Sequence, residues 1–221
     1  LRMAERVNGE TDARVFACVG PYPMLLIGLA ERFGLERAVD IMKAGMEEAQ
    51  TLVLERRAVA IGEIGRPHFP VSAGIMDASN DIMRYGMELA REASCPVVLH
   101  TESADPAVMA DLARIADRAG LGRERVIKHY SPPLVLEEEN HGLFPSVLAS
   151  RQAVLEALSK GDRFVMETDF LDDPSRPGAV MSINTVPKRT KALLSSGEVG
   201  VERAMRIHKD NPERLYGITL E

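Results

Sequence analysis

Short apolar segments alternate with helical segments along most of this 221-residue chain, and no other feature restricts the fold as strongly. Residues 58–61 show no polar alternation, which is typical of a strand buried on both faces of a parallel sheet that helices cover. Successive strand–helix units build such a sheet. The pattern predicts six strands, at residues 14–19, 58–63, 96–100, 125–129, 143–148 and 163–168.

The number of strand–helix units restricts which type of α/β fold the chain can form. A TIM-type (β/α)8 barrel has eight units, whereas six are expected here. The chain starts at Leu1, inside helix-like sequence and without an initiator methionine. We therefore expect a TIM-type barrel that is N-terminally incomplete in this chain, with six of its eight units; an open sheet is the alternative. No linker, repeat or low-complexity tract divides residues 1–221, so a single domain is expected.

Composition restricts the partners. A formal charge of −6 and a pI near 5.5 argue against broad, sequence-independent binding of nucleic acid, which needs a basic surface. Cys18 and Cys95 form no metal-binding pattern, and two cysteines fit a reducing compartment, so we expect a cytoplasmic protein whose thiols lie in the core. No apolar run approaches the ~18 residues that span a membrane.

Four predicted strands end in side chains that can bind a metal ion. These residues are Glu63, His100, His129 and Asp169. Strand ends converge at the mouth of an α/β barrel, so we expect the four side chains to meet there. Imidazole and carboxylate together suit zinc, manganese or magnesium, and such ions acidify bound water and polarise a carbonyl or phosphoryl oxygen. The sequence therefore predicts a site for one or two divalent ions.

Each of these residues also has an ordinary structural interpretation. A single histidine after an apolar strand is often a core or capping residue, and Asp169 alone could cap a turn. Glu63 alone could pair with Arg66 or Lys128. Four independent strand ends that all carry ligand types favour the metal site over these alternatives.

Several segments in order resemble the TatD-type metal-dependent hydrolases of the amidohydrolase superfamily. The turn after the first strand is similar to that family's Gly-x-His-Pro turn. The matching segments are Cys18-Val19-Gly20-Pro21-Tyr22-Pro23, Gly62-Glu63-Ile64-Gly65, Val98-Leu99-His100, Lys128-His129-Tyr130-Ser131, Met166-Glu167-Thr168-Asp169, Asn184-Thr185-Val186-Pro187 and Asn211-Pro212-Glu213-Arg214-Leu215-Tyr216-Gly217.

The resemblance implies a TIM barrel that binds two divalent metals and hydrolyses phosphoester or related bonds, with deoxyribonuclease activity in some members. It implies that Glu63 bridges the metals and that His100 and His129 are ligands. It also implies that Asp169 is a ligand and the base that orients the attacking water. The expected catalytic residues are thus Asp169 and Glu63, and the expected substrate is a small-molecule or nucleic-acid phosphoester.

The sequence departs from the family at three places. The His-x-His pair of the family's first strand is absent, the acid that usually follows the bridging glutamate is replaced within Arg66-Pro67-His68, and Tyr22 stands where the family has its turn histidine. Arg66 is expected to bind a substrate anion or to form a structural ion pair. His68 and His141 are further candidates for binding substrate, the latter at the end of an acidic run, residues 137–139, that is expected near the mouth.

Two other functions stay open from the sequence. The first is an amidohydrolase-like enzyme that cleaves an amide, lactone or triester, because fold alone does not decide the bond. The second is a non-catalytic barrel remnant with an incomplete metal site. The oligomeric state is not predicted.

Overall fold

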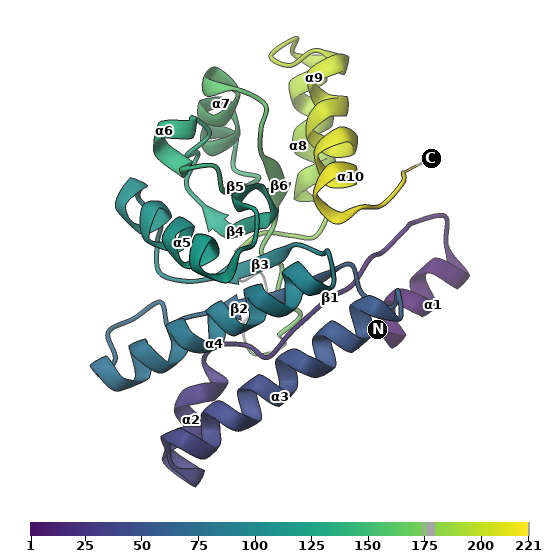
Figure 1. Ribbon diagram of the computed structural model, residues 1–221. Helices are drawn as coiled ribbons and strands as arrows, with labels where there is room; N and C mark the ends of the chain where they lie inside the picture. The colour runs from purple at the N-terminus through teal and green to yellow at the C-terminus, as the bar shows by residue number, and fades with distance from the viewer. Residues whose placement is uncertain (174, 176–179, 221) are drawn as a thin grey trace.

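The computed structural model describes residues 1–173, 175 and 180–220. Its centre is a sheet of six parallel strands that pair in chain order and curl into a half-barrel flanked by helices (Figure 1). This arrangement confirms the prediction of a TIM-type α/β fold. The strands are β1 Cys18–Val19, β2 Ala60–Gly65, β3 Val97–His100, β4 Val126–Ser131, β5 Phe144–Leu148 and β6 Val165–Glu167.

Helices flank the half-barrel (Figure 1). They are α1 Arg2–Glu10, α2 Leu25–Phe33, α3 Leu35–Leu54, α4 Ala73–Glu92, α5 Pro106–Ala119, α6 Glu137–Asn140, α7 Arg151–Lys160, α8 Thr185–Ser195, α9 Val201–Met205 and α10 Asn211–Tyr216. A 3₁₀ turn, Arg123–Arg125, precedes β4, and a π-helical turn, Arg206–Asp210, joins α9 to α10.

Local sequence explains where the helices begin and end. The side chain of Asp105 accepts a hydrogen bond from the backbone N–H of Val108 at 2.8 Å, and Pro106 occupies the first turn of α5. Gly120 ends this helix with φ at +70°, a conformation that glycine adopts without strain. Ser150 caps α7 in the same way, through the N–H of Ala153.

The first strand is shorter than its apolar pattern predicts. The sequence indicates a strand over 14–19, whereas β1 contains only Cys18 and Val19, paired with Ala60 and Ile61 of β2. The side chain of Asn8 binds both backbone groups of Val15, through the N–H at 2.6 Å and the carbonyl at 2.9 Å. The polar groups that a longer strand would offer to the sheet are therefore taken by α1.

The core lies mainly between the convex face of the sheet and its helices. The larger cluster packs α3, α4 and α5 against β2 to β4, and a smaller one packs α7 and α8 against β5. Cys95 is buried as expected, but Cys18 is exposed, and both thiols are free. Burial on both sides keeps the middle strands rigid and so fixes the side chains at their carboxyl ends.

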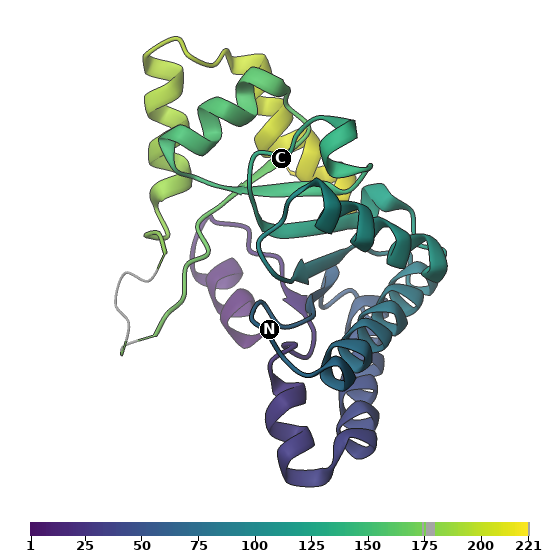
Figure 2. The same ribbon diagram turned by 90° about the vertical axis from the view of Figure 1, so that its left-hand side faces the viewer.

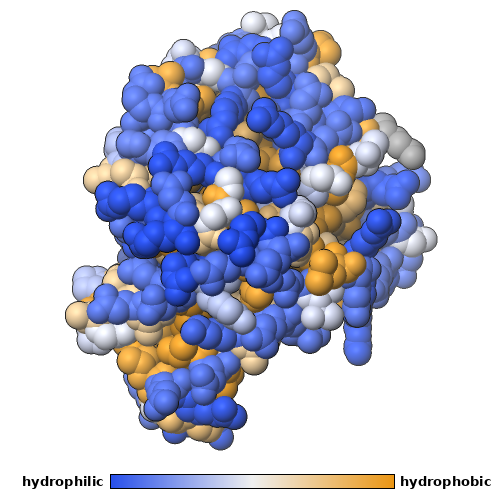
Figure 3. Space-filling view, viewed as in Figure 1, coloured by the Kyte–Doolittle hydropathy of each residue, from blue (hydrophilic) through white to orange (hydrophobic). Residues whose placement is uncertain are grey.

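The two ends of the sheet carry different helices. In Figure 2, as in Figure 1, α8 to α10 lie at the β6 end, and α3 and α4 lie at the β2 end. The space-filling view shows a largely hydrophilic surface with an apolar area over α2 and α3 (Figure 3). The exposed large apolar side chains of these two helices include Leu25, Phe33 and Leu35. Among the described helices, none combines the length and the apolar character needed to cross a membrane.

Candidate metal centre

The four predicted ligands all lie at the carboxyl end of the sheet. Glu63 is in β2, His100 ends β3, His129 is in β4, and Asp169 follows the last residue of β6 by two positions. Because all strands of the sheet are parallel, their carboxyl ends lie at the same edge, and this brings the four residues to one side of the molecule.

Two β-bulges interrupt the regular strand pairing at two of these residues, Glu63 and His129. In β2, Gly62 pairs with Val98 while Ile64 pairs with Leu99, so Glu63 is an extra residue without a partner. In β4, the register shifts in the same way between Lys128 and Ser131, around His129. A bulge turns a side chain away from the regular alternation, and bulges gather next to active sites. Here both occur at predicted ligands.

Glu63, His100 and His129 form a compact cluster. One ligand atom from each lies within 4.8 Å of the others. The Glu63 Oε2 atom is 3.4 Å from His100 Nδ1, and Oε1 is 3.6 Å from His129 Nε2. Each carboxylate oxygen thus faces a different imidazole, and the two rings stack with centroids 5.7 Å apart. Asp169 joins the cluster through His129, since its Oδ1 atom lies 3.7 Å from His129 Nε2.

Charge and burial shift the pKa values of the cluster in the metal-free chain. Burial raises the pKa of Glu63, but His100, His129 and Lys128 outweigh it and hold this pKa below its usual value. Burial lowers the pKa of His129, yet Glu167, Glu63 and Asp169 outweigh it and raise this pKa. The carboxylate of Glu63 is therefore kept ionised, as a metal ligand must be.

Burial is the largest cause of the pKa shift of two further groups, Asp169 and Lys128. The pKa of Asp169 is raised by burial and by Glu167 and Glu63, with His129 opposing. Burial lowers the pKa of Lys128 to about 8, against the attraction of Glu167, Glu102 and Glu63. The Lys128 ammonium donates a hydrogen bond to the backbone carbonyl of His129 at 2.5 Å, so a positive charge lies next to the β4 bulge.

Glu167 is a member of the site that the sequence analysis did not assign. Its Oε1 atom lies 3.0 Å from His129 Nδ1, and it accepts hydrogen bonds from the backbone N–H of Tyr130 at 2.8 Å and from the hydroxyl of Ser146. Its spacing of two residues from Asp169 was the available signal, because two acids at this spacing near a strand end lie on one face.

His68 also approaches the cluster. Its Nδ1 atom lies 2.9 Å from His100 Nε2, and the hydroxyl of Tyr22 lies 3.4 Å from the same nitrogen. His68, His100, His129, Tyr130 and Asp169 are among the residues that line a cavity of about 340 Å³. The cluster is therefore open to a small molecule.

The donor set fits a divalent metal ion. Two imidazoles and a carboxylate are common ligands of zinc and manganese. His100 Nδ1 is buried and has no hydrogen-bond partner among the described residues, although it faces the Glu63 carboxylate. A buried nitrogen without a partner is costly unless something binds it, and a cation between the imidazoles and Glu63 would supply that partner.

Arg66 lies next to the site but is held in ion pairs. Its guanidinium binds Glu102 at 2.5 Å, Asp111 at 2.7 Å and the side-chain oxygen of Asn80 at 3.0 Å, and the side chain is only 7% exposed. The structure therefore places Arg66 in a structural network, the second of the two roles expected for it, and its donors do not face the cavity.

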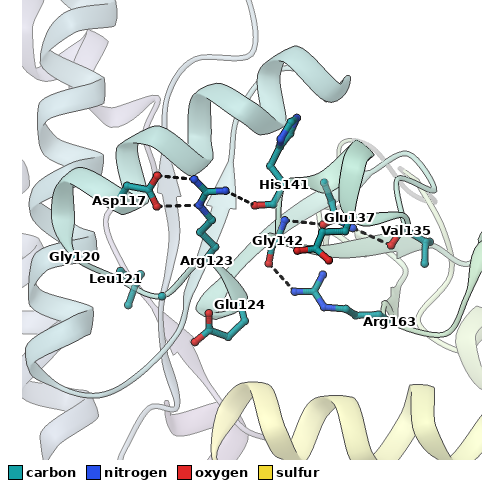
Figure 4. Close-up of a pocket in the computed structure, with 12 residues that line it drawn as sticks. Asp117, Gly120, Leu121, Arg123, Glu124, Val135, Glu137, His141, Gly142 and Arg163 are labelled. Atoms are coloured by element: carbon teal, nitrogen blue, oxygen red, sulfur yellow. Dashed lines mark hydrogen bonds and ion pairs between the residues drawn. The ribbon is translucent and has the colours of Figure 1, made fainter.

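His141 lies at the other end of the sheet. It lines a larger cavity, of about 640 Å³, together with residues that immediately precede β4, β5 and β6 (Figure 4). In this cavity Arg123 binds the carboxylate of Asp117 at 2.6 Å and the carbonyl of His141 at 3.1 Å, so its donors are satisfied locally. The sequence predicted that the acidic run and His141 lie near the mouth of the barrel, and this prediction is wrong. The helix α6 contains the acidic run and ends at His141, and both lie at the amino ends of the strands.

Comparison with known proteins links the chain to one family. The family model described as TatD related DNase matches residues 1–217. MJ1127, an uncharacterized protein of Methanocaldococcus jannaschii, is 40% identical over 222 residues, which cover 100% of this chain and 79% of that protein.

Solved structures share the fold at low sequence identity. YJJV, a TatD homologue from Escherichia coli K12, has a TM-score of 0.66 at 20% identity and covers 99% of this chain and 82% of its own. The phosphotriesterase homology protein of E. coli, solved with phosphate in its active site, has a TM-score of 0.69 at 14% identity, covering 97% and 79%. An organophosphorus hydrolase from Deinococcus radiodurans reaches 0.69 at 18% identity, covering 96% and 73%.

Proposed function

Because the chain belongs to the family of TatD-related DNases, we propose that it is a hydrolase that uses divalent metal ions to cleave phosphoester bonds. One observation supports this most: the ligand atoms of Glu63, His100 and His129 lie within 4.8 Å of one another, beside a cavity that a small substrate can enter.

The proposed ligands divide into two halves around Glu63. His100 offers Nδ1 on the side of Oε2, and His129 offers Nε2 on the side of Oε1, so the carboxylate could hold one ion or bridge two. The donor set suits zinc, manganese or magnesium, with the imidazoles favouring the first two. The chemistry that such an ion supplies is acidification of water and polarisation of the phosphoryl group.

Asp169 is the proposed proton acceptor. It lines the cavity, and its carboxylate lies 3.7 Å from His129 Nε2, at the edge of the cluster. From this position it can bind the attacking water through one oxygen and take its proton, while the other oxygen faces the ligands.

Acidic groups around the cavity favour a small phosphoester over a long nucleic acid. Glu102 lines the cavity, Glu63 and Asp169 belong to the cluster, and the chain has a net charge of −6. A polyanionic backbone would be repelled except where metal ions screen it. We therefore place phosphodiesters of small size first among substrates and single-stranded DNA second.

A direct assay tests the proposal. The protein, stripped of metal and then supplied with manganese or zinc, is incubated with a nitrophenyl phosphodiester, single-stranded DNA, a phosphotriester and a lactone. We expect metal-dependent hydrolysis of the phosphodiester, lost in His129→Ala and retained in His141→Ala, whose residue lies at the opposite end of the sheet. Activity on neither phosphodiester nor DNA, with any ion, would overturn the phosphoesterase proposal; turnover of the triester or lactone alone would instead support the second substrate class.

A further inference from the structure

The two nitrogens of His100 have different surroundings. Nδ1 is buried, faces the Glu63 carboxylate at 3.4 Å and makes no hydrogen bond in the described part of the chain. Nε2 lies 2.9 Å from Nδ1 of His68, a normal hydrogen-bond distance between two ring nitrogens. One of these two nitrogens must donate and the other must accept.

The direction of this bond follows if His100 is a ligand. A neutral imidazole carries one N–H and one lone pair, so a ring that offers Nδ1 to a metal ion has its proton on Nε2. His100 then donates from Nε2, and His68 accepts at Nδ1. A neutral His68 that accepts at Nδ1 carries its own proton on Nε2.

We propose that His68 is a positioning residue of the metal centre, holding His100 in the tautomer whose Nδ1 is free to bind a metal ion. This inference rests on the proposed function, since it assumes that His100 is a ligand. It also gives His68 an Nε2–H donor at the cavity that this residue lines, available to a substrate oxygen. Backbone or carboxylate partners usually fix a ligand histidine; here a second imidazole does so.

Ring contacts keep the two imidazoles in place. His68 packs edge-on against His100 with centroids 5.1 Å apart, and Phe69 also packs edge-on against His68, at 5.1 Å. Tyr22 contacts His100 edge-on at 5.0 Å. The exposed side chain of His68 is therefore braced by its neighbour in sequence rather than by burial.

The partners of the two ligand histidines differ in charge. His129 donates from Nδ1 toward the carboxylate of Glu167, whereas His100 is paired with a neutral ring. A carboxylate raises the basicity of its imidazole, while a neutral acceptor mainly fixes the tautomer and the ring orientation. His68 should therefore be replaceable by any side chain that places an acceptor at the position of its Nδ1.

Zinc affinity of three variants tests this role without an activity assay. Each metal-free protein is titrated with zinc in competition with a chromophoric chelator. His68→Ala should weaken binding about tenfold, the lower end of the usual effect of such partners. His68→Asn, whose amide oxygen can occupy the place of Nδ1, should bind within about threefold of the wild type. His141→Ala, a surface histidine at the opposite end of the sheet, should bind like the wild type.

Nitrogen-15 NMR of the histidine rings reads the tautomers directly. In the zinc-loaded protein we expect His100 to carry its proton on Nε2 and His68 to be unprotonated at Nδ1. Equal zinc affinity of His68→Ala and the wild type, equal weakening in His68→Ala and His68→Asn, or a His100 proton on Nδ1 in the loaded protein would each overturn the role of His68. Failure of the wild type to bind zinc, or unchanged binding in His100→Ala, would instead overturn the metal centre itself.

Discussion

Glu167 fixes which nitrogen of His129 faces the other predicted ligands. Its carboxylate lies 3.0 Å from Nδ1 and is held by the backbone N–H of Tyr130 and the hydroxyl of Ser146. In the neutral ring Nδ1 therefore carries the proton, and the lone pair on Nε2 faces Glu63 and Asp169. The side chain is only 9% exposed, so little solvent reaches this bond.

Replacement of this carboxylate tests its effect on the ligand. Glu167→Gln keeps an oxygen that can accept from Nδ1 but removes the negative charge that makes the imidazole a stronger donor to metal. We expect zinc affinity to fall about tenfold to 100-fold, measured by competition with a chelator. Ser146→Ala, which removes one support of the carboxylate but not its charge, is the matched control and should lose less. Equal affinity in Glu167→Gln and the wild type would contradict this assignment.

Strand ends were the part of the site that the sequence could reveal. Glu63, His100 and His129 each follow an apolar run, and parallel strands bring such positions together whatever the details of packing. The bulges at Glu63 and His129 could not be read from the pattern, because an extra residue in a strand leaves the apolar run unchanged. His141 was misplaced because the path of α6 depends on tertiary packing, not on distance along the chain.

At the level of elements, β2 and β3 approach each other unusually closely at Gly65. This residue has φ at +147°, and a Cβ atom there would lie 2.0 Å from the backbone oxygen of His100. The next residue, Arg66, donates its N–H to the same oxygen at 3.0 Å. The turn that follows β2 therefore packs directly against the backbone of His100, a predicted ligand.

A methyl group at this position should disturb both stability and metal binding. We expect Gly65→Ala to cost about 2 kcal/mol or more, from backbone strain and the displaced strand end, which lowers Tm by roughly 4–8 °C in a chain of this size. Zinc affinity should fall with it, because His100 moves. Gly28→Ala in α2, where nothing lies within 4 Å of the added Cβ, is the control and should leave Tm unchanged or slightly higher. A Gly65→Ala variant with normal Tm and zinc affinity would refute the argument.

An ion-pair network links α5 to the end of β2. Arg66 binds Asp111 of α5 and Glu102, which follows β3. Burial raises the pKa of Asp111, but Arg66 and Arg114 outweigh it, so this pKa lies below its ordinary value. A carboxyl group with a lowered pKa stabilises the fold above its unfolded pKa of about 3.9, and this contribution is lost as pH falls through the folded pKa.

The pH dependence of unfolding measures this link. Asp111→Asn should destabilise the protein by about 1 kcal/mol near pH 6, since the carboxylate is partly exposed and its ion pair is screened. The difference from the wild type should shrink as the pH drops below about 4, where the carboxyl of the unfolded wild type binds a proton, and on through the lower pKa of the folded state. Urea unfolding between pH 6 and pH 3 provides the comparison. A difference that stays constant over this range would show that Asp111 acts through packing and not through its charge.

The strands and helices were predicted best where the sequence is apolar throughout and the residues are buried. The buried strands β2 to β6 match their apolar runs closely, since nothing but a covered parallel sheet suits such sequence. One segment was predicted incorrectly, at the first strand of the sheet. Residues 14–17 do not join β1, because the Asn8 side chain binds the backbone groups of Val15.

The curvature of the whole molecule completes the site. Asp169 follows β6, and β5 lies between β6 and β4, so a flat sheet would separate the strands of Asp169 and His129 by about 9.6 Å, twice the spacing of neighbouring strands. In the half-barrel the Oδ1 atom of Asp169 and the Nε2 atom of His129 lie 3.7 Å apart, because the curl and the lengths of the two side chains together span the intervening strand. The sheet therefore supplies three predicted ligands from adjacent strands and the proposed base from beyond the intervening strand β5.

The position of a bound ion tests the account most directly. Crystals grown with zinc are measured at the zinc absorption edge, where anomalous scattering locates the metal independently of any structural assumption. We predict a peak within about 2.0–2.2 Å of the Glu63 carboxylate and of an imidazole nitrogen, His100 Nδ1 or His129 Nε2. Zinc bound elsewhere in the molecule, or bound to His100 through Nε2, would contradict it.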